Sequence, residues 1–172
     1  MHADGDGWAA GPDGTRRWGV WGAAGLFLVA YDTDSVLMQH RAYWTANGGT
    51  WGVPGGARDS HETVAQSALR EAVEETNIAT DRIETVADIV TAGPYPADPE
   101  RPELPGGWTY TTVIAVTPEQ LPVVADEESL ELRWVPIPEL PKLDLIPPFE
   151  EALPLILARY QEWKKHKMTT QR

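Results

Sequence analysis

The sequence has no cysteine, no long apolar run and fewer basic than acidic residues. The absence of cysteine excludes any disulfide framework. No apolar stretch reaches the roughly 18 residues that a membrane-spanning helix needs, and the first 17 residues are polar and glycine-rich, unlike a secretory leader. With 14 Lys and Arg against 26 Asp and Glu, the net charge of −12 would repel free duplex nucleic acid. We therefore expect a cytoplasmic protein whose partners include neither a membrane nor a nucleic-acid duplex.

Several motifs that would indicate other chemistry are also missing. The sequence contains no G-x-x-x-x-G-K-S/T or G-x-G-x-x-G phosphate-binding loop and no G-x-S-x-G nucleophile elbow. The four histidines, at positions 2, 40, 61 and 166, lack the spacing of a zinc site. The function must therefore be sought in another pattern.

That pattern is a group of acidic residues with helical spacing. Glu71, Glu74 and Glu75 lie three and four positions apart, so on an α-helix they share one face. Like charges at this spacing destabilise a helix unless a cation lies among them. Because hard carboxylate oxygens suit Mg²⁺ or Mn²⁺, which also bind phosphate oxygens, the trio indicates a divalent-metal site for phosphate chemistry.

The residues around the trio extend it into a longer motif. It resembles the Nudix box, G-x5-E-x7-R-E-U-x-E-E-x-G-U, where U is a bulky apolar residue. Seven residues stand where that pattern requires them: Gly56, Glu62, Arg70, Glu71, Glu74, Glu75 and Ile78. Two positions depart from it, since Ala72 is smaller than usual and Asn77 replaces the last glycine. Asparagine is the residue that best substitutes for glycine in a left-handed helix cap, so the second departure is mild.

The hydrophobic pattern predicts one α/β domain over residues 18–172, preceded by a flexible arm at 1–17. The resemblance implies the same fold, an α/β/α sandwich with a mixed β-sheet between helices. Residues 92–107, with five prolines, are expected to form a long irregular loop. We expect strands at 18–30, 35–41, 50–53, 83–91, 108–117 and 130–135, and helices at 62–76 and 148–165.

The first helix should pack one side on the sheet and show its carboxylates to a cleft. The residues opposite the acidic face fall within roughly 100° of one another. They are Ala65, Leu69, Ala72, Val73 and Thr76. Among the tryptophans, Trp18, Trp21 and Trp134 are expected in the core.

The resemblance also implies roles for individual residues. Glu74 and Glu75 match the principal metal ligands, and the Gly55 carbonyl matches a further one. Glu71 matches a metal ligand that in some members is the base for the attacking water. Arg70 matches the arginine that orients these glutamates. Two further acids are expected at the site: Glu62, which ties the loop to the helix and contacts the metal indirectly, through its direct ligands, and Glu128, a glutamate from outside the box.

Contacts to the substrate are harder to assign. Trp51 and Trp108 lie beside predicted turns, where a flat base could stack on them. Arg41 at a strand end and Arg58 in the box loop are candidates for phosphate contacts. Pro94 and Tyr95 occupy the places of two competing subgroup markers, for ADP-ribose and for dinucleoside polyphosphates, so together they do not decide between these substrates.

The overall interpretation is a Nudix-type pyrophosphohydrolase that uses Mg²⁺ or Mn²⁺ and acts on a small nucleotide as a monomer or homodimer. The residues leading into the box are similar to those of MutT-type members, which favours nucleoside triphosphates, including oxidised ones. The alternatives are ADP-ribose or a nucleotide sugar, a dinucleoside polyphosphate, and a non-catalytic nucleotide-sensing module.

Overall fold

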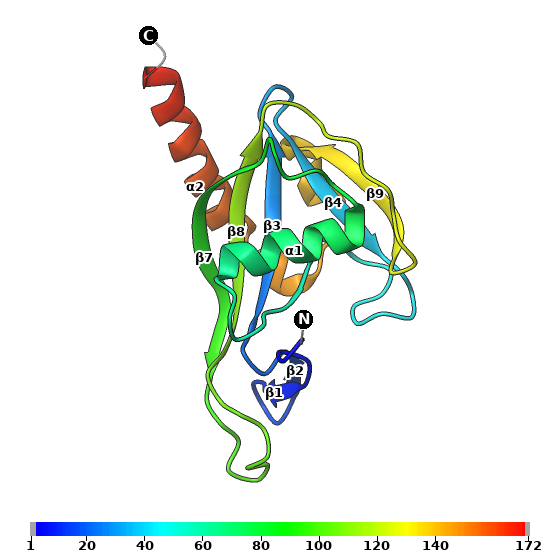
Figure 1. Ribbon diagram of the computed structural model, residues 1–172, viewed down its shortest axis with the longest axis vertical. Coiled ribbons are helices and arrows are strands. Elements are labelled where there is room, and N and C mark those ends of the chain that lie inside the picture. Colours follow the sequence, from blue (N-terminus) through cyan, green and yellow to red (C-terminus); the bar gives the residue numbers. More distant parts are fainter. Residues whose placement is uncertain (1–2, 171–172) are drawn as a thin grey trace.

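The computed structural model describes residues 3–170, and two long apolar strands form its centre (Figure 1). Strand β3 (Ala23–Ala30) is buried along its whole length and pairs in parallel with β8 (Trp108–Thr117), from Ala23 opposite Tyr110 to Ala30 opposite Thr117. Continuous apolar strands of this kind need cover on both faces. The two strands therefore define the middle layer of the fold.

The other strands extend this sheet on both sides. The order is β5–β4–β3–β8–β7, with β6 paired to β3 and β9 paired to β4, giving seven strands of mixed direction. Their bounds are β4 Ser35–Arg41, β5 Trp51–Gly52, β6 Gly55–Ala57, β7 Glu84–Tyr95 and β9 Ser129–Pro136.

One long helix covers each face of the sheet. Helix α1 (Val64–Thr76) packs on the even-numbered side chains of β3, among them Leu26 and Leu28. Helix α2 (Pro147–Thr170) packs on the odd-numbered ones, among them Phe27 and Val29, and its last turns extend beyond the sheet in Figure 1. A short 3₁₀ helix, η1 (Ile137–Lys142), precedes α2. The predicted α/β/α sandwich with a mixed sheet is confirmed.

Within the described part of the chain, no helix combines the length and the hydropathy needed to cross a bilayer.

The ends of α1 follow from its caps. The Thr63 side chain accepts from the Gln66 backbone amide while the Gln66 side chain accepts from the Thr63 amide, a reciprocal capping box. At the other end Asn77 adopts the left-handed conformation, φ 56°, and its amide donates to the Val73 carbonyl. Asparagine therefore fills the place of the missing glycine without breaking the cap.

The buried stripe of α1 differs from the predicted one. Val73 is 39% exposed, whereas Ala68 and Ala72 are fully buried against β3. The helix is rolled so that Glu75, which is 7% exposed, also faces inward. Two alanines at the contact let the helix approach the sheet closely, and this brings the acidic side of the helix to β6.

The first 17 residues also differ from the expected flexible arm. Strands β1 (Trp8–Ala10) and β2 (Arg16–Trp18) pair as an antiparallel hairpin, and Ala9 and Ala10 are buried. The single strand predicted at 18–30 is interrupted because Gly19 and Gly22 turn the chain with φ of 113° and 90°. Residues 1 and 2 lie outside the described residues.

Two smaller corrections concern the tryptophans and the proline-rich loop. Trp18 and Trp21 are 45% and 49% exposed rather than buried: Trp18 ends the hairpin, and Trp21 lies in the turn that follows it. Strand β7 runs on to Tyr95, so the irregular loop begins after that residue and not at position 92.

The cap at Asn77 leads to a first prediction. Replacing Asn77 with alanine should lower the free energy of unfolding by about 1–2 kcal/mol, because a Cβ without a polar group tolerates the left-handed conformation poorly. Glycine at the same position should preserve or raise the stability. Urea unfolding followed by circular dichroism measures both variants, and an alanine variant as stable as the wild type would contradict this account of the cap.

Candidate active site

A single arginine joins the box loop to helix α1. Arg70 donates from Nε to Glu62 Oε2 at 2.6 Å and from Nη2 to Glu62 Oε1 at 2.9 Å, a side-on bidentate pair. Its Nη2 also reaches the Ala57 carbonyl at 3.0 Å, and its Nη1 lies 3.1 Å from Glu71 and 3.3 Å from Glu74. Because the hydrogen bonds from Arg70 favour the ionised form, the pKa of Glu62 lies below its ordinary value. Arg70 thus contacts Glu62, Glu71 and Glu74 of the acidic cluster at the same time.

Two other glutamates of the cluster are less well compensated: Glu75 is buried, and Glu71 is half-buried with one contact to Arg70. Burial raises the pKa of Glu75 to about 9 and that of Glu71 to about 7. The charges of Glu71 and Glu128 raise the pKa of Glu75 further, and those of Glu74 and Glu128 raise the pKa of Glu71 further. The Gly55 amide donates to Glu75 Oε2 at 3.0 Å, which offsets a part of the cost of burial. Neighbouring carboxylates that resist ionisation together mark a place where positive charge is missing.

Glu128 completes this group from outside the box. Its side chain is exposed, and its backbone carbonyl accepts from the Ala42 amide at 2.9 Å next to the end of β4. Its charge raises the pKa of both Glu71 and Glu75, so the three carboxylates act on one region. The structure therefore brings together Glu128 and the box glutamates that the sequence analysis paired with it.

The donor set fits a divalent cation. Glu71, Glu75 and Glu128 present hard oxygen atoms, and a cation among them would remove their mutual repulsion. Gly56 leaves room for this arrangement, since a Cβ at that position would lie 2.6 Å from the Glu71 carboxyl carbon. Glu74 is on the same helix face but its side chain is 57% exposed, at the rim of the group.

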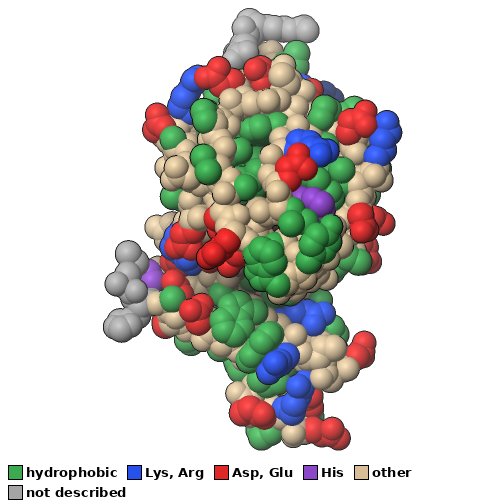
Figure 2. All heavy atoms as spheres, turned by 90° about the vertical axis from the view of Figure 1, so that its right-hand side faces the viewer, with side chains coloured by type: hydrophobic (Ala, Val, Ile, Leu, Met, Phe, Trp, Pro, Cys, Tyr) green, Lys and Arg blue, Asp and Glu red, His purple; other side chains and the backbone are tan. Residues whose placement is uncertain are grey.

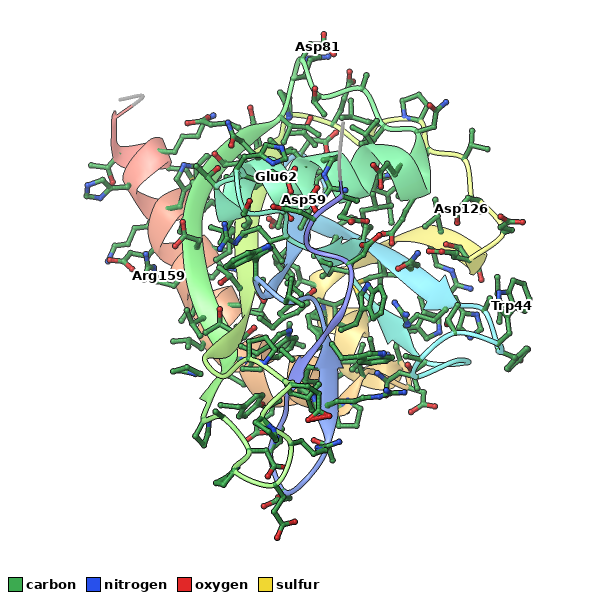
Figure 3. All side chains as sticks on the ribbon, turned by 60° about the horizontal axis from the view of Figure 1, so that its bottom comes forward. Trp44, Asp59, Glu62, Asp81, Asp126 and Arg159 are labelled. Carbon is green, nitrogen blue, oxygen red and sulfur yellow. The ribbon has the colours of Figure 1, made fainter. Side chains whose placement is uncertain are left out.

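A second acidic cluster lies in the box loop. Ligand atoms of Asp59, His61 and Glu62 lie within 4.8 Å of one another, and Figure 3 shows Asp59 and Glu62 between α1 and the N-terminal segment. Asp59 accepts from the Gly5 amide at 2.9 Å, and Glu62 accepts from Arg70 and from the Asp59 amide at 3.0 Å. Glu62 thus connects the loop to the helix, and it also belongs to a group of described residues whose ligand atoms are close enough together to hold a metal ion.

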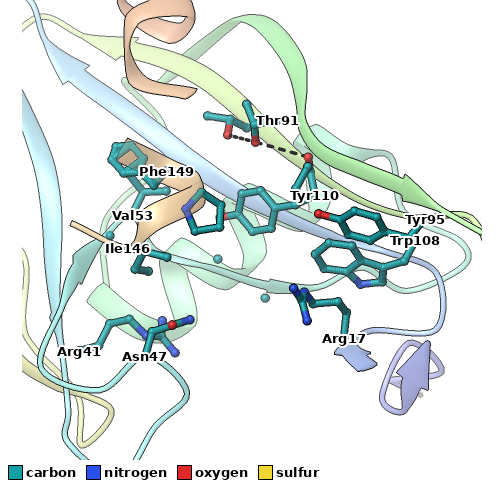
Figure 4. A pocket seen from close by; sticks show the side chains of 16 residues that line it. Arg17, Arg41, Asn47, Val53, Thr91, Tyr95, Trp108, Tyr110, Ile146 and Phe149 are labelled. Atoms are coloured by element: carbon teal, nitrogen blue, oxygen red, sulfur yellow. Dashed lines mark hydrogen bonds between the residues drawn. The ribbon is translucent and has the colours of Figure 1, made fainter. Parts of the chain in front are cut away.

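An aromatic pocket lies on the α2 side of the sheet and reaches the glycines of β6 (Figure 4). The Tyr95 and Trp108 rings stack at 5.8 Å in one wall, and the Tyr110 hydroxyl lies so close to Gly25 that a Cβ there would be 1.9 Å from it. The lining includes two arginines and no carboxylate among the described residues. Its main side chains are Arg17, Arg41, Asn47, Val53, Thr91, Tyr95, Trp108, Tyr110, Ile146 and Phe149.

The five predicted substrate contacts divide into two groups. Arg41, Tyr95 and Trp108 line the pocket, and the charge of Arg41 lowers the pKa of Glu75, so Arg41 stands at the acidic end. Trp51 does not line the pocket, because it is buried in the core with its ring stacked on His40 at 4.5 Å. Arg58 is also outside the lining: it donates to the Glu62 carbonyl at 2.7 Å and braces the loop.

Sequence reasoning missed several lining residues, above all Arg17 and Tyr110. Arg17 lies in a segment whose glycines and aspartates indicate a flexible arm. Tyr110 lies in a strand where alternation alone does not tell which face holds a site. Gly25, a glycine inside the apolar strand β3, is the one signal in the sequence that could have indicated the close approach of another side chain at this point.

Charge elsewhere on the molecule is spread out. On the face shown in Figure 2, acidic and basic side chains are interspersed among apolar ones rather than gathered in one field. The pocket differs from the rest of this acidic chain, whose net charge is −12. Its described lining contains two arginines and no carboxylate.

Comparison with known proteins supports the resemblance to the family. The family model described as NUDIX domain matches residues 21–156. The "Putative 8-oxo-dGTP diphosphatase 3" of Mycobacterium tuberculosis is 48% identical over 152 residues, which cover 87% of this chain and 67% of that protein. A nucleoside triphosphate pyrophosphatase/Nudix hydrolase fusion protein of Bifidobacterium longum is 41% identical over 94% of this chain and 33% of its own length.

A solved structure is similar over nearly its whole length. The crystal structure of a Nudix hydrolase from M. smegmatis, RenU, superimposes with a TM-score of 0.75 at 39% identity and covers 96% of both chains.

The Arg70 network gives a second prediction. Replacing Arg70 with alanine should lower the free energy of unfolding by about 2 kcal/mol or more, because Glu62 would keep a buried charge without its partner. Arg82 offers a matched control: its pair with Glu119 joins side chains that are 49% and 56% exposed. The R82A variant should lose about 0.5 kcal/mol or less. Equal losses in the two variants, measured by urea unfolding, would contradict the role of Arg70.

The raised pKa values give a third prediction, for the metal-free protein. Glu71 and Glu75 hold protons more tightly when folded, at pKa values of about 7 and about 9, than at their ordinary value of 4.5. The stability they contribute is therefore fully present below about pH 4.5 and is lost as the pH rises through about 7 and about 9.

Mg²⁺ should restore this lost stability, so its effect on the melting temperature should grow with pH. Differential scanning calorimetry with EDTA or Mg²⁺ at several pH values measures the melting temperature. In the E75Q variant, the melting temperature should depend less on pH and less on Mg²⁺. A Mg²⁺ effect that does not change with pH would be evidence against cation binding at these carboxylates.

Proposed function

The chain belongs to the Nudix family, and from that premise we propose that it is a divalent-metal-dependent pyrophosphohydrolase acting on nucleoside triphosphates, oxidised ones included. One observation carries the proposal: buried carboxylates and an aromatic pocket meet at Gly55 and Gly56. Gly55 donates to Glu75, Gly56 lies under Glu71, and both glycines line the pocket. A nucleotide whose base occupies the pocket would extend its phosphates to the carboxylates.

The residues of the acidic group have distinct parts in the proposed reaction. Mg²⁺ or Mn²⁺ held by Glu71, Glu74, Glu75 and the Gly55 carbonyl would lower the pKa of bound water and neutralise phosphate charge. Glu71, which lies beside this site, would accept a proton from the attacking water. Arg70 keeps Glu71 and Glu74 in place, and Glu128 adds charge to the same region.

The pocket supports a nucleotide as the substrate. Tyr95, Trp108 and Tyr110 offer flat apolar surfaces, and base stacking on aromatic rings contributes about 1–3 kcal/mol per base. Thr91, Thr112 and Asn47 add polar groups that could fix its orientation. The relative in M. tuberculosis, 48% identical, bears the name of an 8-oxo-dGTP diphosphatase, and this favours oxidised deoxynucleoside triphosphates.

A fourth prediction tests the catalytic assignment. The E75Q variant, and to a smaller extent E74Q, should lower kcat by roughly 100-fold or more because each removes a ligand charge from the metal. The E119Q variant, changed at an exposed surface pair, should keep wild-type activity. Release of pyrophosphate or phosphate at saturating Mg²⁺ is measured, with circular dichroism to confirm folding.

The substrate is tested with a panel in the same assay. It contains nucleoside triphosphates, 8-oxo-dGTP, ADP-ribose, nucleotide sugars and diadenosine polyphosphates. We expect the highest kcat/KM for a triphosphate. A preference for ADP-ribose or a dinucleoside polyphosphate would overturn the substrate assignment, and wild-type rates in E75Q would overturn the catalytic one. No turnover of any compound would favour the nucleotide-sensing module.

A further inference from the structure

The N-terminal hairpin closes one side of the substrate pocket. Its residues precede the span 21–156 that the family model matches. Even so, Arg17 of β2 lines the pocket together with Tyr95 and Trp108 (Figure 4). Ala9, which pairs with Arg17 across the hairpin, is buried against Trp108 and Ala23. The hairpin is therefore docked by an apolar contact that includes a wall of the pocket.

Hydrogen bonds fix the hairpin to two segments that are distant in the sequence. One set joins it to the box loop, and the other joins it to the proline-rich loop and to β8. The bonds run from Gly5 N to Asp59 Oδ1 at 2.9 Å, from Ala10 N to Pro105 O at 2.9 Å, from Arg101 Nη2 to Thr15 O at 2.8 Å and from Trp108 Nε1 to Trp18 O at 3.1 Å. An element held at so many points places Arg17 firmly.

The Arg17 guanidinium lies over the Tyr95 ring at 5.9 Å from its centroid and donates hydrogen bonds to described residues from Nη1 alone. Its Nη1 donates to Thr15 Oγ1 at 3.1 Å and to the Arg16 carbonyl at 3.2 Å. Gly11 makes room for this arrangement, since a Cβ there would lie 2.6 Å from Thr15 Oγ1, which accepts from Arg17, and 3.2 Å from Arg17 Nη1. Among the residues that the structure describes, none accepts from Nε or Nη2 of Arg17.

Another arginine of the protein shows what the Nε–Nη2 edge of Arg17 can bind. Arg70 uses its Nε and Nη2 to hold both oxygens of Glu62 at 2.6 and 2.9 Å. The same fork on Arg17 matches a group that carries two oxygens in one plane, as a carboxylate or a phosphate does. The pocket itself offers no such group, because its described lining contains no carboxylate.

We propose that Arg17 is a substrate-binding residue supplied by the N-terminal hairpin, and that its Nε–Nη2 fork binds oxygens of the substrate's phosphate chain. This inference rests on the proposed function, since it takes the ligand of the pocket to be a nucleotide. Arg41 stands at the acidic end of the same pocket. Arg41 would then meet the phosphate chain at the acidic end of the pocket, and Arg17 would reach it from the side of Tyr95 and Trp108.

The neighbouring Arg16 provides the matched control. It lies on the same strand with its guanidinium over the Trp8 ring at 3.8 Å, is exposed, and does not line the pocket. The R17A and R16A variants therefore remove the same charge from adjacent positions of one element. A difference between them reports on the pocket and not on the net charge.

Binding in EDTA separates this test from the catalytic one. Isothermal titration calorimetry measures the affinity of each variant for 8-oxo-dGTP and for the uncharged nucleoside 8-oxo-deoxyguanosine. A hydrogen-bonded charge of this kind is worth roughly 10- to 100-fold in affinity, so R17A should lose that much for the triphosphate and little for the nucleoside. R16A should bind both like the wild type.

Two further variants test the geometry of the fork. R17K keeps the charge but not the two-donor edge, and should recover only a part of the affinity. G11A keeps Arg17 but crowds its guanidinium, and should weaken triphosphate binding in the same direction as R17A. With Mg²⁺ present, R17A should act more on KM than on kcat.

Unchanged triphosphate binding by R17A would overturn the assignment, and so would an equal loss for the nucleoside, which would place Arg17 on the base. Absence of nucleotide binding by the wild type would overturn it as well. Failure of the proposed function has a different signature: no panel compound is hydrolysed, whatever the difference in binding between R17A and R16A.

Discussion

The bidentate pair between Arg70 and Glu62 is the interaction on which the rest of the site depends. Glu62 ends the box loop and Arg70 lies two turns along α1, so the pair sets the position of the loop relative to the helix. The same guanidinium reaches the Ala57 carbonyl, which ties β6 to α1. Gly55 and Gly56 of β6 are thereby held against Glu75 and Glu71.

The single positive charge of Arg70 cannot balance the negative charges of all the carboxylates around it, and an excess of negative charge is left at the site. Glu62 receives two donors from Arg70 and has a lowered pKa, while Glu71 and Glu75 are buried and have raised ones. A second fixed cation in the protein would remove the repulsion permanently and leave nothing for a metal to do. The unbalanced charge is what makes a removable cation favourable at this point and connects stability, pH and metal binding.

The pocket shows how much of the site comes from distant segments. Arg17, Arg41, Tyr95, Tyr110 and Phe149 lie on the hairpin, β4, β7, β8 and α2. The acidic cluster, by contrast, lies mostly within 20 residues of sequence, from Gly55 to Glu75. Under the proposed function, the acidic cluster would determine the reaction. The residues that line the pocket would determine which molecule fits.

The sequence by itself determined the reaction class, the sandwich of helices around a mixed sheet, and the grouping of Glu71, Glu74 and Glu75 around Arg70. These features depend on spacing within one helix, on caps such as Asn77, and on apolar strands such as β8, which are local patterns. Tertiary structure decided the rotation of α1 about its axis, which buries Ala68 instead of Val73. It also decided that Trp51 packs in the core and that Arg58 braces the box loop.

Tertiary structure also decided that residues 8–18 form a hairpin that brings Arg17 to the pocket, rather than a flexible arm. That hairpin is stabilised by hydrogen bonds and apolar contacts to residues about 50 to 100 positions away, such as Asp59 and Trp108. No periodicity within the segment encodes partners at that distance. The spacing of the carboxylates is a local feature of the sequence, whereas long-range packing alone places Arg17 beside Tyr95 and Trp108 in the pocket.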